Sequence, residues 1–153
     1  MLVADASDKY SDLGMTAVCD IVPRTGPLGG ILTALDAAVT YYIFVVACDM
    51  PFLNMRLMQF MRNNINGADV VVPCLGMRYE PLLAIYSKRC IEPIRQLIDD
   101  GQLRITALYD MVKTKVIGEE MVRRFDPQAL SFFNINTMED YERARNYYDS
   151  LSP

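Results

Sequence analysis

An uninterrupted apolar run, YIFVVA at Tyr42–Ala47, restricts the choice of fold more than any other part of this chain. Its aromatic and β-branched residues follow one another without polar alternation, which is typical of a strand covered on both faces in a parallel sheet. A shorter run of the same character, ADVVVP, contains Val70–Pro73. Because helices must cover both faces of such a sheet, the two runs predict an α/β fold.

Helical patterns lie between and around these strands. They cover Leu28–Ala38, Asn54–Asn64 and Ile91–Asp99. Strands and helices that alternate in units of about 30 residues indicate right-handed βαβ crossovers within one sheet. We therefore expect a mostly parallel sheet with helices packed against it.

Two later segments add a strand and a final helix. Leu82–Tyr86 predicts a strand, and a turn at Gly76-Met77 would make part of the sheet antiparallel. Asp140 follows Thr137 by three residues, which resembles a helix N-terminal capping box. The last helix is therefore expected to span residues 141–151.

The beginning of the chain, MLVADAS, predicts a strand that ends at the carboxyl edge of the sheet. In a parallel nucleotide-binding sheet the central strand usually comes first and carries the phosphate-binding turn. Since this sequence starts directly with MLVADAS, we expect the N-terminal βα unit to be missing.

Length and charge limit the kind of protein further. The 153 residues suit one domain, 1–153, and contain no repeat, linker or low-complexity tract. The net charge of −4 argues against a broad basic face for nucleic acid or membrane. Met1–Ala4 is followed at once by acidic residues, and no apolar run approaches the roughly 20 residues of a membrane span. We therefore expect a cytoplasmic protein.

The chain contains no histidine, which excludes Ser-His-Asp and Cys-His catalysis and histidine-based zinc sites. Carboxylate, amide, Arg/Lys and backbone chemistry remain available. The four cysteines, at positions 19, 48, 74 and 90, form no C-x-x-C pair and are expected to be buried reduced thiols.

Asp49 follows the strongest strand, in the segment ACDMPF. A carboxylate at the carboxyl end of a buried parallel strand projects into the crevice where α/β folds bind ligands. Such a group suits Mg²⁺, which takes one or two protein carboxylates together with substrate phosphate oxygens. The alternative is that Asp49 only caps the following turn.

Two other segments carry candidate ligand-binding groups. Gly26–Gly30 (GPLGG) lies at a loop-to-helix transition, where backbone N–H groups favour anions, although many ordinary helices also start this way. Asn134 and Asn136 alternate along an extended stretch and so face the same side. They could reach one ligand together, or could bond only to neighbouring backbone.

Taken together, GPLGGILTAL, FVVACDMPF, PLLAIYS and FFNINTMEDYERA, in that order, resemble the molybdenum cofactor guanylyltransferases, which are MobA-type nucleotidyltransferases. The resemblance covers essentially the whole chain. It implies a three-layer α/β/α Rossmann-like nucleotidyltransferase fold. It also implies Mg²⁺-dependent transfer of GMP from GTP to the phosphate of molybdopterin, with release of pyrophosphate.

The resemblance also implies roles for individual residues. Asp49 would bind Mg²⁺ and act in catalysis, while Asp20 and the loop residues Gly26, Pro27, Leu28 and Gly30 would contact the guanine nucleotide. Asn134 and Asn136 match residues on the metal or acceptor side, with Asn136 also expected in catalysis. Arg104, in GQLRI, matches an arginine that binds the molybdopterin phosphate; the alternative is a solvated surface arginine.

Three departures from the family pattern stand out. The usual Gly-rich segment L-A-G-G-x-S-x-R-M-G-x-x-K, which holds the triphosphate, has no counterpart. Asp5 or Ala6 stands where the family has an Asn at the end of its second strand, and Thr-Met-Glu-Asp replaces Thr-Pro-Glu-Asp. We therefore expect an N-terminally truncated nucleotidyltransferase.

Alternatives of three kinds remain open at this stage. The chain could be a sibling that uses CTP on the same acceptor, or a guanylyltransferase with another phosphorylated acceptor. It could be a non-catalytic nucleotide-binding relic. It could also dock on other molybdenum cofactor assembly proteins, with its ten methionines on an adaptable surface rather than filling the core.

Overall fold

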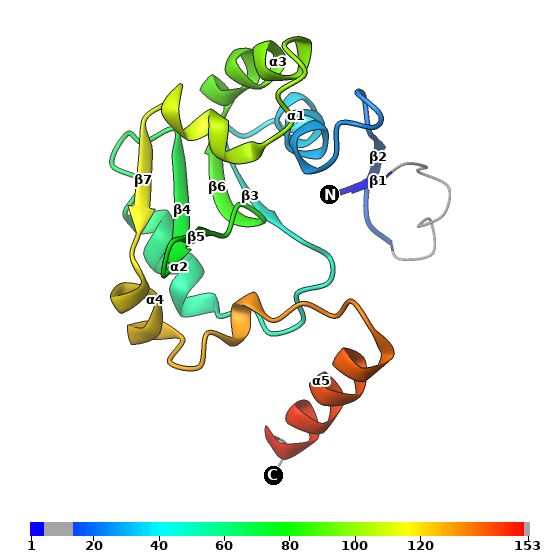
Figure 1. Ribbon diagram of the computed structural model, residues 1–153, viewed down its shortest axis with the longest axis vertical. Coiled ribbons are helices and arrows are strands. Elements are labelled where there is room, and N and C mark those ends of the chain that lie inside the picture. Colours follow the sequence, from blue (N-terminus) through cyan, green and yellow to red (C-terminus); the bar gives the residue numbers. More distant parts are fainter. Residues whose placement is uncertain (5–13, 152–153) are drawn as a thin grey trace.

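The structure is a computed structural model that describes residues 1–4 and 14–151 (Figure 1). Asp5 and Ala6, which stand at the family's Asn position, lie outside the described residues. The described part forms three layers, with helices on both faces of a central sheet and one helix, α5, beyond its edge. The predicted α/β class and three-layer arrangement are confirmed.

The central sheet is mixed, whereas a mostly parallel sheet was expected. It contains five strands: β3 (Tyr42–Val46), β4 (Val70–Leu75), β5 (Arg78–Tyr79), β6 (Leu83–Ser87) and β7 (Thr114–Ile117). β6 pairs antiparallel with β3 and with β4, and β7 pairs parallel with β4. The predicted turn after β4 is confirmed, since β4 and β5 form a hairpin with Gly76 at its tip.

The described residues form five α-helices, four of which cover the two faces of the sheet, while α5 lies beyond its edge. They are α1 (Pro27–Ala37), α2 (Met55–Asn63), α3 (Ile91–Asp99), α4 (Glu119–Phe125) and α5 (Met138–Leu151), with short 3₁₀ turns η2 (Lys88–Cys90), η3 (Ile105–Asp110) and η4 (Leu130–Phe132). Val70 and Val72 of β4 lie in the core with α1 and α3, whereas Val71 lies in the core with α2 and α4. This alternation explains why the strand sequence is apolar throughout.

A second, smaller sheet contains the start of the chain. β1 (Leu2–Ala4) pairs parallel with β2 (Ala17–Cys19), and this pair packs on α1. The strand expected in MLVADAS is thus confirmed for its described residues. β2 escaped prediction because three residues are too short to display a pattern.

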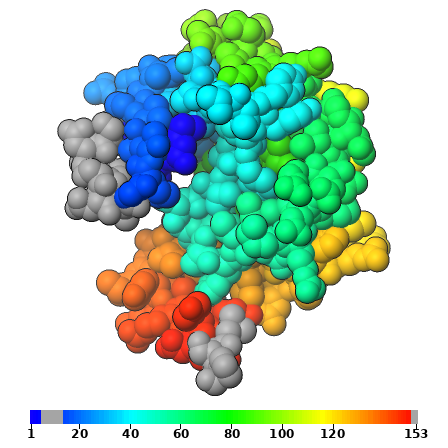
Figure 2. Space-filling model, turned by 180° about the vertical axis from the view of Figure 1, so that it is seen from behind, coloured from blue at the N-terminus to red at the C-terminus, as the bar shows by residue number. Residues whose placement is uncertain are grey.

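A groove of about 860 Å³ lies between β1 and β3 and is floored by α1. β3 pairs with β6 along one edge, and its five residues are only half-buried, whereas all five residues of β6 are buried. The expectation of full coverage for this strand was therefore wrong. Figure 2 shows the first residues, in dark blue, beside the cyan-to-teal surface of α1 and β3.

In residues 1–4 and 14–151, none of the helices combines enough length with enough apolar character to cross a membrane.

Candidate functional site

Three strands of the central sheet end at the same edge. β3, β4 and β7 run in one direction, because β3 and β4 both oppose β6 while β7 is parallel to β4. Their carboxyl ends point to the lower side of Figure 1, where the loop after β3, the β4–β5 hairpin and the segment before α5 come together. Ligands of open α/β sheets bind outside the carboxyl ends of the strands, so this edge is the expected position of a site.

Asp49 and Asn134 meet at this edge. The backbone N–H of Ile135 donates a hydrogen bond to the carbonyl of Asp49 at 2.9 Å, which joins the loop after β3 to the segment before α5. The Oδ1 atoms of Asp49 and Asn134 are both buried and have no hydrogen-bond partner among the residues that the structure describes. Leaving such an oxygen unsatisfied costs about 1–3 kcal/mol, so two of them together indicate a place for a positively charged ligand.

The segment that carries Asn134 is held in place by the buried carboxylate of Asp126. Asp126 is 4% exposed and accepts hydrogen bonds from the backbone N–H groups of Leu130 and Ser131. The Ser131 hydroxyl in turn accepts from the backbone N–H of Asn54, whose side chain donates to the carbonyl of Phe125. These contacts lock the start of α2 to the loop before α5.

The side chain of Asn136 is exposed, unlike the buried oxygens of Asp49 and Asn134. Its backbone N–H donates to the Asp140 carboxylate, which also accepts from the hydroxyl and the N–H of Thr137. These bonds lower the pKa of Asp140, and the bond from the Thr137 hydroxyl has the largest effect. The predicted capping box is confirmed, and α5 begins at residue 138 rather than 141.

A separate cavity of about 660 Å³ lies where β1 and β2 meet the start of α1. Its lining includes Asp20, Arg24, Gly26 and Gly30, together with Val3, Ala4, Cys19 and Pro23. Three of the residues expected to contact a nucleotide are thus brought together. Gly30 lines the groove beside β3 as well, together with Pro27 and Asp49.

The carboxylate of Asp20 accepts hydrogen bonds that hold the cavity wall together. Its Oδ1 accepts from the backbone N–H of Val22 and from the hydroxyl of Thr33, and that hydroxyl accepts from the N–H of Ile21. Both bonds to Asp20 end on the same oxygen. The carboxylate is therefore held in one orientation on the cavity wall, whatever it binds there.

The glycines of the GPLGG loop differ in their roles. Gly26 precedes α1 with a φ of 61°, a backbone conformation that other residues rarely adopt. Gly29 packs so closely on Thr25 and the carbonyl of Val22 that a Cβ atom would clash. Gly30 has open space where a side chain would be, and this space belongs to the cavity.

Leu28 and Arg104 do not place their side chains in either cavity. The Leu28 side chain is fully buried in the core, so only its backbone could meet a ligand. Arg104 is exposed and stands just before η3.

Arg24 is a residue that the sequence pattern did not single out. It is exposed, lines the smaller cavity and has a φ of 68°. Among the described residues that line the two cavities, it is the one with a positively charged side chain. A cation two residues before GPLGG was the available signal, but the left-handed backbone was not visible in the sequence.

The cysteines are less uniform than expected. Cys90 is buried, and burial raises the pKa of its thiol to about 11. Cys19 and Cys48 are exposed, so the prediction of burial was wrong for both, since they end strand or loop segments beside the cavities. Within the described ranges, 1–4 and 14–151, three or more Cys, Asp or Glu side chains nowhere gather in a metal-binding cluster.

The three-layer fold, the cavity at a glycine-containing helix start and the acidic and amide oxygens at the carboxyl edge define a nucleotide-binding α/β protein. Residues 1–115 match the sequence profile described as "MobA-like NTP transferase domain". The chain belongs to this family of nucleotidyltransferases.

Relatives and solved structures agree with this assignment. The chain is 38% identical over 133 residues to a probable molybdenum cofactor guanylyltransferase of Pelotomaculum thermopropionicum, covering 87% of this chain and 65% of that protein. It is 36% identical to a molybdenum cofactor guanylyltransferase of Desulfosudis oleivorans, covering 94% and 72%. The crystal structure of molybdopterin-guanine dinucleotide biosynthesis protein A from Archaeoglobus fulgidus matches with a TM-score of 0.82 at 26% identity, covering 97% and 77%. The chain thus spans about two thirds to three quarters of these proteins.

Proposed function

We propose that this chain transfers GMP from GTP to the phosphate of molybdopterin, giving molybdopterin guanine dinucleotide and pyrophosphate. The observation that carries the proposal is the pair of buried, unpartnered oxygens on Asp49 and Asn134 at the carboxyl edge of the sheet. The names of the relatives from Pelotomaculum and Desulfosudis support the choice of reaction.

The donor set of this site fits Mg²⁺. A carboxylate and an amide oxygen are hard ligands, and Mg²⁺ is commonly held by one or two protein oxygens plus substrate phosphates. Asp49 and Asn134 would hold the ion. When bound, it would supply positive charge that reduces the repulsion between the phosphates of the two substrates.

The smaller cavity is our candidate for the guanine nucleotide. Its volume of about 660 Å³ lies within the range typical of small-molecule sites. Guanine presents neighbouring N–H donors that a carboxylate such as Asp20 can accept, whereas cytosine presents a single amino donor. Gly26 and Gly30 leave backbone close to the cavity, and Arg24 adds a positive charge for a phosphate.

The transfer needs no histidine. A phosphate monoester is largely ionised at neutral pH, so its oxygen can attack the α-phosphorus of GTP without a general base. One P–O bond forms at the α-phosphorus, and the bond to the β-phosphate bridging oxygen breaks. The electron pair leaves with pyrophosphate.

Arg104 and Asn136 are our candidates for binding the acceptor. We assign Arg104 to the molybdopterin phosphate on the family resemblance of GQLRI; its side chain is exposed, and a guanidinium can hold a phosphate through two parallel hydrogen bonds. Asn136 is exposed at the same edge as Asn134 and is our candidate for the acceptor side.

The proposal is tested by incubating the chain with molybdopterin, Mg²⁺ and GTP labelled at the α-phosphate. We expect label in the dinucleotide from GTP and little from labelled CTP. Asp49→Ala should lower the transfer rate by about two orders of magnitude, since a direct metal ligand matters at least as much as its supporting partners. Asp36→Ala, which removes an exposed carboxylate of α1 paired with Arg95, should change little.

The other outcomes separate the alternatives. Transfer from CTP in preference to GTP would replace the guanine assignment by a cytidylyltransferase. Binding of GTP without any transfer would leave a non-catalytic nucleotide-binding protein, or one that works through other cofactor-assembly proteins.

A further inference from the structure

We propose that a cluster of three aromatic rings, Phe52, Phe133 and Tyr147, positions the oxygens of Asp49 and Asn134 for cation binding. We call these three residues the aromatic clamp. The inference rests on the proposed function, because it takes the cation site described there as given.

The clamp joins the two loops that carry the unpartnered oxygens. Phe52 follows Asp49 by three residues, and Phe133 directly precedes Asn134. The ring centroids of Phe52 and Phe133 are 6.0 Å apart. This contact adds to the backbone bond from Ile135 to Asp49 and to the bond from Asn54 to Ser131, which also join the two segments.

The third ring comes from α5. Tyr147 meets Phe52 edge-to-face, with ring centroids 5.2 Å apart, and its hydroxyl donates to the side chain of Gln128 at 3.2 Å. The guanidinium of Arg143 lies 5.4 Å from the centroid of Phe133. In Figure 1, α5 stands away from the central sheet, and in Figure 2 its red surface adjoins orange and teal segments at one end of the molecule. These aromatic contacts therefore attach α5 to the loops of the site rather than to the sheet.

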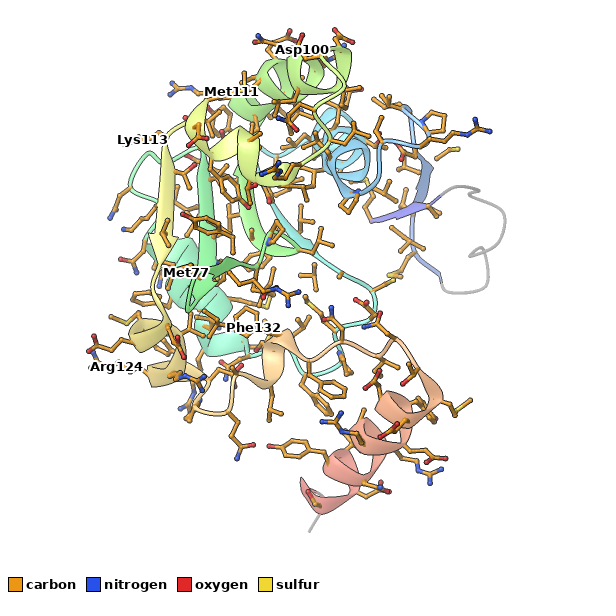
Figure 3. All side chains as sticks on the ribbon, viewed as in Figure 1. Met77, Asp100, Met111, Lys113, Arg124 and Phe132 are labelled. Atoms are coloured by element: carbon orange, nitrogen blue, oxygen red, sulfur yellow. The ribbon has the colours of Figure 1, made fainter. Side chains whose placement is uncertain are left out.

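Two consecutive phenylalanines, Phe132 and Phe133, pack in different directions and together hold the segment before Asn134. Phe132, labelled in Figure 3, packs against the core formed with α2 and α4, whereas Phe133 belongs to the clamp. The segment is thereby fixed from two sides immediately before Asn134.

The unpartnered oxygens show why such fixing is needed. A loop with freedom to turn would rotate the two side chains toward water or toward a backbone donor, since an unmade hydrogen bond costs free energy. The arrangement persists because surrounding contacts over-determine it, as is usual for unfavourable geometry at functional sites. The clamp supplies those contacts on the side of α5.

The experiment measures Mn²⁺ binding to the full chain by electron paramagnetic resonance, with Mn²⁺ alone as the probe. Tyr147→Ala should raise the Kd for Mn²⁺ roughly tenfold, as the loss of supporting contacts does in other metal sites. Tyr147→Phe keeps the ring and should bind within about twofold of the wild type. The matched control is Tyr148→Ala, because Tyr148 is the next residue of α5 and is 65% exposed.

Thermal unfolding of each variant separates positioning from simple loss of structure. A Kd raised in Tyr147→Ala, while the variant still unfolds cooperatively and Tyr148→Ala binds normally, supports the clamp. If Tyr147→Ala does not fold, Phe52→Leu takes its place with the same expected rise in Kd. A folded clamp variant that binds Mn²⁺ as tightly as the wild type overturns the inference.

Asp49→Ala, measured in the same series, keeps the two proposals apart. If Asp49→Ala loses Mn²⁺ binding but the clamp variants retain it, only the clamp fails. If Asp49→Ala binds Mn²⁺ unchanged, the cation site of the proposed function fails, and the clamp fails with it.

Discussion

Arg24 combines an unfavourable backbone with a position on a cavity wall. Its φ of 68° falls in the left-handed region, which costs a residue with a side chain about 1–2 kcal/mol. Strain of this kind tends to persist at functional sites, where the surrounding structure maintains it. At Arg24 the strained backbone carries the positive charge that lines the smaller cavity.

Two substitutions at this residue separate strain from charge. Arg24→Gly relieves the left-handed backbone and should raise the free energy of unfolding by roughly 0.5–1 kcal/mol, after the entropy cost of glycine. Arg24→Ala keeps the strain and should not gain stability. Both variants lose the cation, so both should bind GTP about two- to fivefold more weakly, as expected for the loss of one exposed charge contact.

Urea unfolding and calorimetric titration of GTP measure the two effects. Wild-type affinity for GTP in Arg24→Ala would remove this residue from the nucleotide site. A loss of stability in Arg24→Gly would mean that the left-handed backbone is not a source of strain.

At the scale of elements, α1 offers neighbouring glycines with opposite expectations. Gly30→Ala adds a Cβ in open space and improves helix propensity, so stability should rise by up to about 1 kcal/mol. The added methyl enters the cavity, and GTP affinity should fall. Gly29→Ala collides with Thr25 and the carbonyl of Val22, so it should lower stability instead.

Thermal unfolding and GTP titration of both variants check this pair. Equal stability changes at the two positions would contradict the tight packing at Gly29. Unchanged GTP affinity in Gly30→Ala would place the nucleotide elsewhere.

Tyr109 of η3 gives a prediction in alkaline solution. Burial raises its pKa to about 12, and its hydroxyl lies 3.5 Å from that of Tyr86, whose pKa burial also raises. A raised pKa means that the folded state favours the neutral phenol. The stability contribution is therefore complete below the unfolded pKa of about 10 and is lost as the pH rises toward 12.

The free energy of unfolding should accordingly fall by up to about 2–3 kcal/mol above pH 10. Tyr109→Phe should make this decline shallower, whereas Tyr148→Phe, at an exposed position, should leave it unchanged. Urea midpoints measured between neutral and strongly alkaline pH test the expectation. An unaltered slope in Tyr109→Phe would show that this phenol does not govern the decline.

Sequence patterns predicted the elements with strong periodicity and missed the weak ones. The continuous run at β3, the helix Ile91–Asp99 and the cap at Thr137 were recognisable because local composition decides them. β7 was missed because it has four residues, of which Thr114 and Lys115 are polar and Val116 is 44% exposed. α4, with seven residues, is too short to show a helical period.

The candidate site was predictable in its residues but not in its geometry. Asp49 follows a strong strand, and any pattern of this kind points to the carboxyl edge. That the buried, unpartnered amide oxygen belongs to Asn134, while Asn136 is exposed, depends on contacts between distant segments. The bond from Asn54 to Ser131 alone spans 77 positions of sequence, and no local pattern encodes it.

At the scale of the whole molecule, the two sheets differ in how many helices and strands pack against them. β4 and β6 lie in the interior, with helices on both faces and strands on both sides. The main helix contact of the β1–β2 pair is with α1, and the groove separates the pair from β3. Segments with few buried apolar contacts open at lower free energy than the core.

Amide hydrogen exchange should therefore divide the chain into two parts. We expect the amides of β1 and β2 to exchange at least about a hundredfold faster than those of β4 and β6, which corresponds to a difference of roughly 3 kcal/mol in opening free energy. Mass spectrometry of peptides covering Leu2–Ala4, Ala17–Cys19 and Leu83–Ser87 measures this directly. Addition of GTP should slow exchange in β1 and β2 selectively, because the smaller cavity is lined by both strands. If all strands are equally protected without nucleotide, the small sheet is as stable as the large one and the expectation is wrong. If GTP protects only β4 and β6, the nucleotide does not bind in the smaller cavity.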